Sequence, residues 1–129
     1  MKILLDTHVW LWLISEPKRI GRSAMKLLES PANDLYLSAI SAWEIAIKFA
    51  AGRLSLPGKP ADLITAWMAA TDATPLSVEH RHALSIVSLP LHHRDPFDRM
   101  LIAQARVEGM PIMTCDPAFD AYDVKVIRA

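Results

Sequence analysis

Close to its start, the sequence reads Ile3-Leu4-Leu5-Asp6-Thr7-His8. The first three residues form a short unbroken apolar run, which is typical of a strand buried on both faces of a parallel sheet. From Thr7 the pattern predicts a helix to about Ser15, and Pro17 ends it. The chain therefore begins with a strand that passes at once into a helix, with an acid, Asp6, at the junction.

The same alternation of short apolar strands and helices continues along the chain. Proline and glycine mark helix boundaries, since Pro60 and Pro96 suit first helical positions and Gly109 follows the last helix. This pattern predicts an α/β fold with a mostly parallel central sheet flanked by helices. Further strands are expected at 35–38, 74–76, 111–114 and 124–127, and further helices at 22–29, 42–50, from 60, at 78–87 and at 96–108.

Composition narrows the class of protein. A length of 129 residues fits one domain, so we expect a single domain over 1–129, and a hydrophobic fraction of 52% is enough for a core. Lys and Arg together number 14, as do Asp and Glu. Since the net charge is zero, any nucleic acid must be held by a local basic patch. The single cysteine, Cys115, excludes an intramolecular disulfide and a cysteine-based zinc site.

No segment predicts a membrane span or a secretion signal. Asp6 and His8 interrupt the apolar start of the chain, and no small-residue cleavage pattern follows it. The remaining apolar run, Val9–Ile14, is far too short to cross a bilayer. We therefore expect a cytoplasmic protein that makes no membrane contact.

Four acids from distant parts of the chain fall at strand ends or helix starts. Asp6 directly follows the first strand, and Asp116 follows the strand at 111–114 after one intervening residue. Glu44 and Asp98 fall in the first turns of two expected helices. Because ligands of parallel sheets bind outside the carboxyl ends of the strands, these four side chains can share one rim.

Each acid also has a local structural explanation. Ser41-Ala42-Trp43-Glu44 matches a capping box, Asp95 fits an N-cap before a helix-starting proline, and Asp98 suits the positive end of the helix dipole. Asp116 also precedes a proline and fits a cap. Together, however, four carboxylates on one rim repel one another and call for a cation. Oxygen ligands without nearby cysteine or clustered histidine favour Mg²⁺ or Mn²⁺ over zinc.

Four segments carry a family resemblance: Leu5-Asp6-Thr7-His8, Ser38-Ala39-Ile40-Ser41-Ala42-Trp43-Glu44-Ile45, Arg94-Asp95-Pro96-Phe97-Asp98-Arg99-Met100-Leu101-Ile102-Ala103-Gln104-Ala105 and Thr114-Cys115-Asp116. In order and spacing they resemble stand-alone PIN domains over the whole chain. In particular they resemble the VapC-type ribonuclease toxins of bacterial type II toxin–antitoxin pairs, and the third segment is the most specific. The resemblance implies a metal-dependent endoribonuclease that hydrolyses single-stranded RNA through an acidic quartet with Mg²⁺ or Mn²⁺.

By this resemblance the quartet falls on Asp6, Glu44, Asp98 and Asp116, and Thr114 matches a hydroxyl residue often found two positions before the last acid. We assign Asp6 and Asp98 as primary metal ligands, with Asp116 completing the shell. Glu44 is assigned to orient or deprotonate the attacking water. Water as the nucleophile makes the RNA 2′-hydroxyl unnecessary, and the family's products carry a 5′-phosphate and a 3′-hydroxyl.

The resemblance also implies partners. A small cognate antitoxin protein is expected to wrap the domain and block the acidic groove, and homodimers are common in the family. The RNA substrate needs a basic patch, although pairs such as Glu44–Lys48 at helical spacing explain some basic residues structurally. The basic residues form two clusters and one flanking pair, namely Lys18, Arg19, Arg22 and Lys26; Lys48, Arg53 and Lys59; and Arg94 with Arg99.

Histidines and tryptophans are predicted to have structural roles. His80 and His82 lie two apart on an expected helix, so their side chains point in different directions and make a poor metal pair. His92 and His93 lie in the loop before the acidic helix, where they can reach RNA. The tryptophans are expected in the core or in a partner interface, namely Trp10, Trp12, Trp43 and Trp67, and of these Trp10 and Trp12 on the first helix are the best candidates for the interface.

Other protein classes fit the sequence less well. A phosphorelay receiver domain needs a pair of acids after its first strand and a lysine at the end of a later strand, whereas Asp6 stands alone and Lys125 begins its strand. A dehalogenase-type phosphatase needs D-x-D, but His8 occupies the second position. The glycine-rich nucleotide-binding motifs are absent. A catalytically inactive PIN-shaped or receiver-like binding module is the remaining alternative, and the presence of all four acids argues against it.

Overall fold

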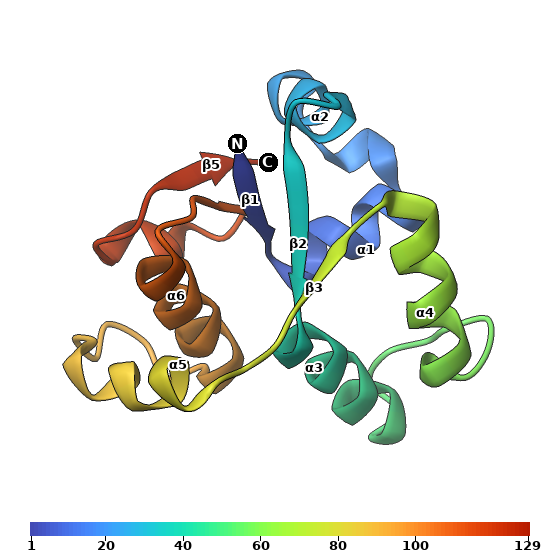
Figure 1. Ribbon diagram of the computed structural model, residues 1–129. Helices are drawn as coiled ribbons and strands as arrows, with labels where there is room; N and C mark the ends of the chain where they lie inside the picture. Colours follow the sequence, from blue (N-terminus) through green and yellow to red (C-terminus); the bar gives the residue numbers. More distant parts are fainter.

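A five-stranded sheet forms the centre of the molecule, with strand order β3-β2-β1-β4-β5. Every strand pair is parallel, so the expectation of a mostly parallel sheet holds throughout. The computed structural model describes residues 1–129 (Figure 1). The strands are β1 (Lys2–Leu5), β2 (Asp34–Ser38), β3 (Thr74–Leu76), β4 (Ile112–Thr114) and β5 (Val126–Arg128). The α-helices are α1 (Thr7–Ser15), α2 (Arg22–Glu29), α3 (Ala39–Ala50), α4 (Pro60–Thr71), α5 (His80–Ser85) and α6 (Pro96–Glu108). Three short 3-10 helices are η1 (Pro17–Arg19), η2 (Ile86–Ser88) and η3 (Pro117–Ala121).

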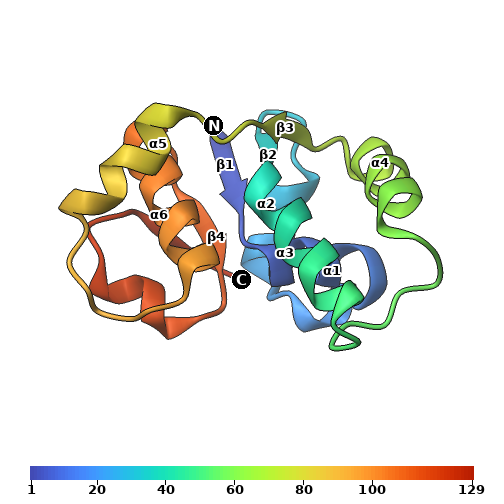
Figure 2. The ribbon, with the colours of Figure 1, turned by 90° about the horizontal axis from the view of Figure 1, so that it is seen from below.

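Strand β1 is buried on both faces of the sheet, which explains its unbroken apolar sequence. Ile3 and Leu5 join a hydrophobic cluster with side chains of α1, α2 and α3, whereas Leu4 joins a second cluster with side chains of α6. Figure 2 shows α5 and α6 on one side of the sheet and α1 and α4 on the other. The sheet is therefore a middle layer between two sets of helices. None of the helices is both long enough and apolar enough to span a membrane.

Most element boundaries agree with the expectations from the sequence, and three elements differ by two residues or more, namely the helix expected at 78–87, the last strand and helix α3. The helix expected at 78–87 is shorter, because Ser85 and Ser88 donate their hydroxyls to the carbonyl oxygens of His82 and Ser85 and the chain tightens into η2. The last strand begins at Val126 rather than 124, since its parallel register aligns Val126 with the first residue of β4.

Helix α3 begins three residues earlier than expected. Its N-cap is Ser38, whose Oγ accepts a hydrogen bond from the backbone N–H of Ile40 at 3.0 Å. Ser41 therefore lies inside the helix, and the capping box predicted from Ser41 to Glu44 does not exist. Glu44 lies in the second turn of α3 rather than the first, so its position is not explained by helix capping.

Candidate active site

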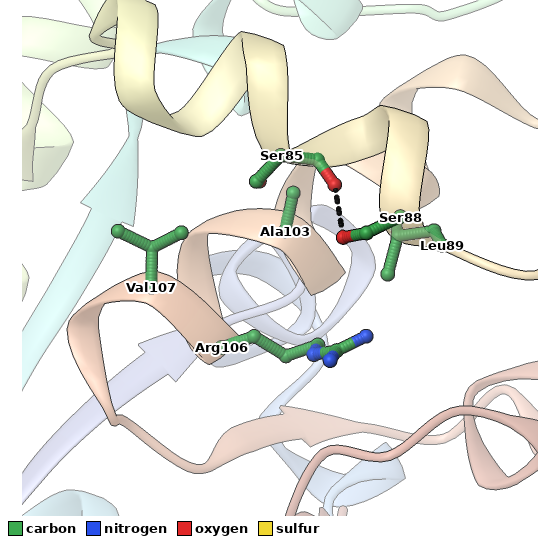
Figure 3. Close-up of a pocket in the computed structure, with 6 residues that line it drawn as sticks. All are labelled: Ser85, Ser88, Leu89, Ala103, Arg106 and Val107. Carbon is green, nitrogen blue, oxygen red and sulfur yellow. Dashed lines mark hydrogen bonds between the residues drawn. The ribbon is translucent and has the colours of Figure 1, made fainter.

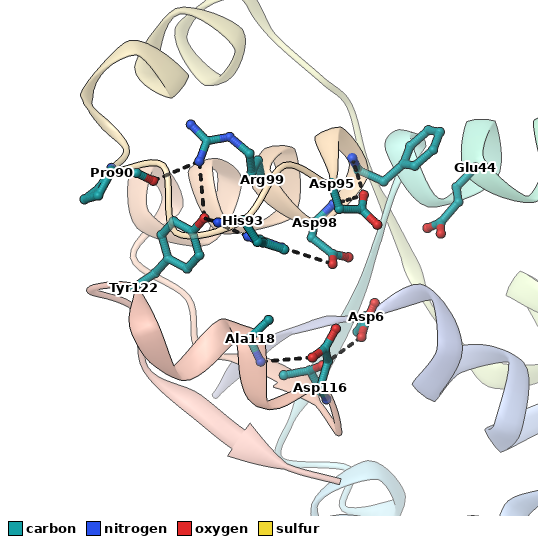
Figure 4. A network of polar contacts seen from close by, with 12 residues as sticks. Asp6, Glu44, Pro90, His93, Asp95, Asp98, Arg99, Asp116, Ala118 and Tyr122 are labelled. Carbon is teal, nitrogen blue, oxygen red and sulfur yellow. Dashed lines mark hydrogen bonds and ion pairs between the residues drawn. The ribbon is translucent and has the colours of Figure 1, made fainter.

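The four acids singled out in the sequence meet beyond the carboxyl ends of the central strands. Asp6 follows β1, and its backbone N–H donates to the carbonyl oxygen of Met113 in β4 at 2.9 Å. Asp116 follows β4 and caps η3, while Glu44 and Asp98 come from α3 and α6. Figure 4 shows the carboxylates of Asp6, Asp98 and Asp116 facing a common space, with Glu44 beside it.

Asp98 has the strongest electrostatic signature of this group. Its side chain is 14% exposed, and burial raises the pKa of its carboxyl to about 8. The charges of Asp95, Asp6, Asp116 and Glu44 contribute to this raised pKa, in that order of effect. A carboxyl that loses its proton only near neutral pH, surrounded by other acids, needs a cation nearby to be stably ionised.

Asp6 and Asp116 are tied together by Thr114. The Thr114 hydroxyl donates to Asp6 Oδ2 at 2.7 Å and accepts the backbone N–H of Asp116 at 3.0 Å. Burial raises the pKa of Asp6 above its usual value, and the hydrogen bond from Thr114 opposes that rise. Asp116 Oδ1 accepts the backbone N–H of Ala118 at 2.9 Å, so one of its oxygens is engaged in capping η3. Thr114 thus orients Asp6 through the Asp6 carboxylate and Asp116 through the Asp116 backbone N–H.

Asp95 and Asp98 have different local roles. Asp95 is the N-cap of α6, because its Oδ1 accepts the backbone N–H groups of Phe97 at 2.9 Å and of Asp98 at 3.2 Å. This confirms the capping role assigned to Asp95 from the sequence. The carboxylate of Asp98 accepts no backbone N–H and faces the other acids, as Figure 4 shows.

Glu44 is buried and forms an ion pair with the next turn of its own helix. Its side chain is 4% exposed, and Lys48 Nζ donates to its Oε2 at 2.6 Å, as the helical spacing predicted. Ser41, one turn earlier, accepts a hydrogen bond from the hydroxyl of Thr7 at 2.8 Å. This contact joins α3 to the start of α1, directly after Asp6. Helix α3, which carries Glu44, and helix α1, which follows Asp6, are thereby held against each other.

His93 is a neighbour of the acids whose role at the site the sequence did not reveal. Its Nε2 lies 3.3 Å from Asp98 Oδ2, and its Nδ1 lies 2.7 Å from the hydroxyl oxygen of Tyr122. The sequence indicated only that His92 and His93 lie in the loop before the acidic helix, where they can reach RNA. Tyr122 lies 29 residues later, so no local motif links the two residues.

The donor set at this rim fits a hard divalent cation. All four groups are carboxylates with oxygen donors, and both ring nitrogens of His93, which contacts Asp98, lie within hydrogen-bond distance of Tyr122 and Asp98. Cys115 lies between Thr114 and Asp116, and burial raises the pKa of its thiol, which therefore stays protonated. A cation bound here would relieve the mutual repulsion at Asp98. The residues present therefore fit a divalent cation that is bound through carboxylate oxygens.

A second group of polar side chains lies between α5 and α6. Ligand atoms of Glu79, His82 and Glu108 lie within 4.8 Å of one another. The backbone N–H of Glu79 donates to His82 Nδ1 at 3.0 Å, so the ring proton is on Nε2, which lies 2.8 Å from Glu108 Oε1. Arg81 pairs with both glutamates. Neither His82 nitrogen has a lone pair left for a metal, and the group joins the two helices.

The five main cavities of the molecule are lined by residues other than the four acids. A cavity of about 210 Å³ lies between η2 and the later turns of α6, where Arg106 and Val107 contribute side chains (Figure 3). It has no acid or histidine in its wall. Arg106 lies eight residues after Asp98, roughly 12 Å along the helix axis, so this cavity is separate from the acidic rim.

Aromatic side chains divide between the core and the surface. Trp10 is fully buried and donates its indole N–H to the Thr71 hydroxyl at 3.1 Å, so it is a core residue and the expectation that it contributes to an interface is wrong. Trp43 is 57% exposed and packs edge-to-face on Phe97, with 5.6 Å between the ring centres. These two rings directly precede Glu44 and Asp98 in the sequence, so an aromatic pair lies beside the acids.

Comparison with known proteins gives consistent similarities over nearly the whole chain. Residues 3–125 match the family model described as PIN domain. Ribonuclease VapC22 of Mycobacterium tuberculosis is 31% identical over 117 residues, which cover 88% of this chain and 86% of that protein. Among solved structures, VapBC2 from Rickettsia felis bound to a DNA fragment from its promoter has a TM-score of 0.76 at 12% identity, covering 99% of this chain and 98% of that one. A member of the VapBC family of toxin-antitoxin systems from Mycobacterium tuberculosis, VapBC-5, has a TM-score of 0.64 at 21% identity, covering 99% and 98%. These two structures share the fold.

Proposed function

Because this chain belongs to the PIN-domain family, we propose that it is a divalent-metal-dependent endoribonuclease that acts as the toxin of a toxin–antitoxin pair. The observation that carries the proposal is the convergence of Asp6, Glu44, Asp98 and Asp116, which together with burial raises the pKa of Asp98 to about 8. The ribonuclease name of a relative at 31% identity supports the activity. In this proposal residues 1–129 form one PIN domain that works in the cytoplasm, where its RNA substrate lies.

Asp6 and Asp98 would hold Mg²⁺ or Mn²⁺ as the main ligands, with Asp116 completing the set. A divalent cation bound there supplies charge neutralisation at the phosphate and a more acidic attacking water. Glu44 orients this water or takes its proton, and the oxygen available for that task is Oε1, because Lys48 occupies Oε2. Thr114 keeps Asp6 in place throughout through its 2.7 Å hydrogen bond.

RNA would be held near the rim by exposed basic side chains rather than by net charge. Of the two arginines that flank the acidic turn, Arg99 is engaged with the carbonyl oxygen of Pro90 at 2.8 Å and with Tyr122. Arg94 is exposed and is the better phosphate contact of the two. The exposed Trp43 is placed to meet a base or a partner protein beside the acids.

A small antitoxin protein is the proposed regulatory partner, and it would act by covering the acidic rim. The support is the VapC name of the relative and the toxin-antitoxin description of a protein with the same fold. A homodimer of this chain is the proposed assembly.

Purified protein incubated with cellular RNA tests the activity directly. We expect cleavage with Mg²⁺ or Mn²⁺, none with EDTA, and fragments that begin with a 5′-phosphate when their ends are mapped. The matched control is Asp120→Asn, which removes an exposed carboxylate of η3 outside the quartet. Equal cleavage in EDTA would exclude the metal mechanism, and no cleavage under any condition would favour the inactive binding module.

A further inference from the structure

We infer that His93 is a positioning residue for Asp98, and that Tyr122 and Arg99 fix the His93 ring with its Nε2–H directed at the carboxylate. The inference rests on the proposed function, because it concerns an acid that we assign as a metal ligand. It adds His93, and the two residues that hold its ring in place, to the four acids of the site.

Three segments of the chain meet in this network. His93 lies in the loop before α6, Arg99 lies in the first turns of α6, and Tyr122 follows η3. Arg99 Nη1 donates to the Tyr122 hydroxyl oxygen at 3.2 Å, and the backbone N–H of His93 donates to the same oxygen at 3.2 Å. Figure 4 shows the chain of contacts from Arg99 through Tyr122 and His93 to Asp98.

The hydroxyl of Tyr122 determines which His93 nitrogen carries the proton. A phenolic oxygen accepts at two lone pairs and donates one proton. The Arg99 and His93 backbone donors use both lone pairs, so the hydroxyl proton must go to an acceptor. The acceptor within reach is His93 Nδ1 at 2.7 Å. If His93 Nδ1 carried the proton instead, the Tyr122 oxygen would face three donors with only two lone pairs.

Because Nδ1 accepts, the ring proton lies on Nε2. Nε2 is 3.3 Å from Asp98 Oδ2, and it therefore donates to this oxygen. This leaves Oδ1 facing the other acids. A hydrogen bond to one carboxylate oxygen restricts rotation of the carboxyl group, so Asp98 is held ready for a cation before the cation arrives.

Packing keeps the network rigid. Tyr122 is 5% exposed, and the side chain of His93 is 21% exposed. His92 packs edge-on against the Tyr122 ring, with 4.9 Å between the ring centres, and the guanidinium of Arg99 is anchored at the Pro90 carbonyl oxygen. The supports of His93 are therefore themselves fixed, as positioning groups require.

The protonation pattern can be read by nuclear magnetic resonance without any metal or RNA. A long-range ¹H–¹⁵N spectrum at pH 9, where the carboxyl of Asp98 is ionised, distinguishes the protonated from the unprotonated ring nitrogen, and the signals of His93 are identified by their loss in His93→Gln. We expect Nε2 protonated and Nδ1 unprotonated in the unaltered protein. In Tyr122→Phe the preference is expected to weaken, because the donor to Nδ1 is gone.

The positioning role is tested by direct Mn²⁺ titration, with free Mn²⁺ followed by electron paramagnetic resonance. We expect His93→Leu to weaken affinity about 10- to 100-fold, which is typical for loss of a partner that orients a metal ligand. His93→Gln, whose amide N–H can still reach Asp98, should recover most of the loss, and Tyr122→Phe should fall between. Tyr36→Phe, which removes the one other tyrosine hydroxyl, is the matched control and should not change the affinity.

Each result decides the question. An Nδ1-protonated ring in the unaltered protein, or folded His93→Leu and Tyr122→Phe variants with unchanged Mn²⁺ affinity, would overturn the inference. Loss of affinity in His93→Leu without recovery in His93→Gln would also overturn it, since any disruption of packing gives that result. Failure of the unaltered protein to cleave RNA, with the expected spectrum and Mn²⁺ affinities intact, would instead count against the proposed function.

Discussion

Asp95 and Asp98 lie three residues apart at the start of α6, and only one of them needs its charge. Asp95 Oδ1 accepts two backbone N–H groups, a task that a neutral amide oxygen performs about as well. Asp98 faces three other acids and His93, where a negative charge is the property that a cation recognises. Replacing the carboxylate by an amide therefore leaves the capping role of Asp95 intact but removes the charge that Asp98 needs.

We predict that Asp95→Asn retains the fold and a substantial share of RNA cleavage, whereas Asp98→Asn retains the fold and loses cleavage. In Asp95→Asn the side-chain amide oxygen can still cap α6, and removing the Asp95 charge reduces the repulsion felt by Asp98. Cleavage of cellular RNA and growth on expression in bacteria are compared for the two variants at matched melting temperature. A folded Asp95→Asn protein as inactive as Asp98→Asn would place Asp95 among the groups that act on RNA.

The positions of the acids could be predicted because each follows a recognisable local signal. Asp6 comes directly after an apolar strand, and Asp98 comes after a proline that begins a helix. Glu44 was placed correctly near the rim, but for the wrong local reason, since the cap of α3 is Ser38. The role of His93 could not be predicted, because it depends on a hydroxyl 29 residues away.

At the scale of elements, α6 is the helix whose two ends are most clearly determined by sequence. Pro96 begins it after the Asp95 cap, and Gly109 ends it in the left-handed region at a φ of 66°. A side chain at this φ is strained, although a Cβ added to Gly109 would have open space around it. Backbone conformation rather than crowding therefore requires glycine here.

We predict that Gly109→Ala destabilises the protein by about 1 kcal/mol, because an L-residue in the left-handed region carries that order of cost. Gly58→Ala is the matched control. A Cβ there would lie 3.7 Å from the Leu63 side chain, an ordinary contact, and the φ of Gly58 is not in the left-handed region. Urea unfolding of both variants measures the difference. Equal stability of the two variants would show that α6 does not need glycine at its end.

The first and last residues of a helix were predicted correctly where the sequence has clear boundary signals. Where these signals are weak or compete, the predicted limits were wrong. Helix α1 begins at Thr7, and Pro96 and Gly109 mark the two ends of α6. The limits of α2 follow from the helical spacing of its apolar residues. The start of α3 was wrong because two serines, Ser38 and Ser41, compete as caps in the sequence. The start of β5 depends on its register with β4, which no local pattern contains.

At the scale of the whole molecule, the acidic rim lowers stability in the absence of a cation. Folding brings four carboxylates from separate segments to one place, and burial with this repulsion raises the pKa of Asp98 from 3.8 to about 8. The folded state therefore holds a proton on Asp98 that the unfolded chain has already lost above a pH of about 4. Because the folded state binds more protons in this range, the free energy of unfolding falls as the pH rises from about 4 to about 8, by at most about 1.4 kcal/mol per pH unit.

This argument predicts the behaviour of Asp98→Asn in EDTA. The amide does not titrate, so the free energy of unfolding of the variant should lack the fall with pH that Asp98 causes. The variant should therefore be more stable than the unaltered protein at pH 8, and the difference should shrink toward pH 5. Excess Mg²⁺ should raise the melting temperature of the unaltered protein at pH 8 by mass action and leave that of Asp98→Asn much less affected. Thermal unfolding between pH 5 and pH 8, with and without Mg²⁺, measures both effects. If Asp98→Asn were instead less stable than the unaltered protein at pH 8 without metal, the Asp98 carboxylate would be contributing to folding rather than opposing it, and the rim would not be a site held open for a cation.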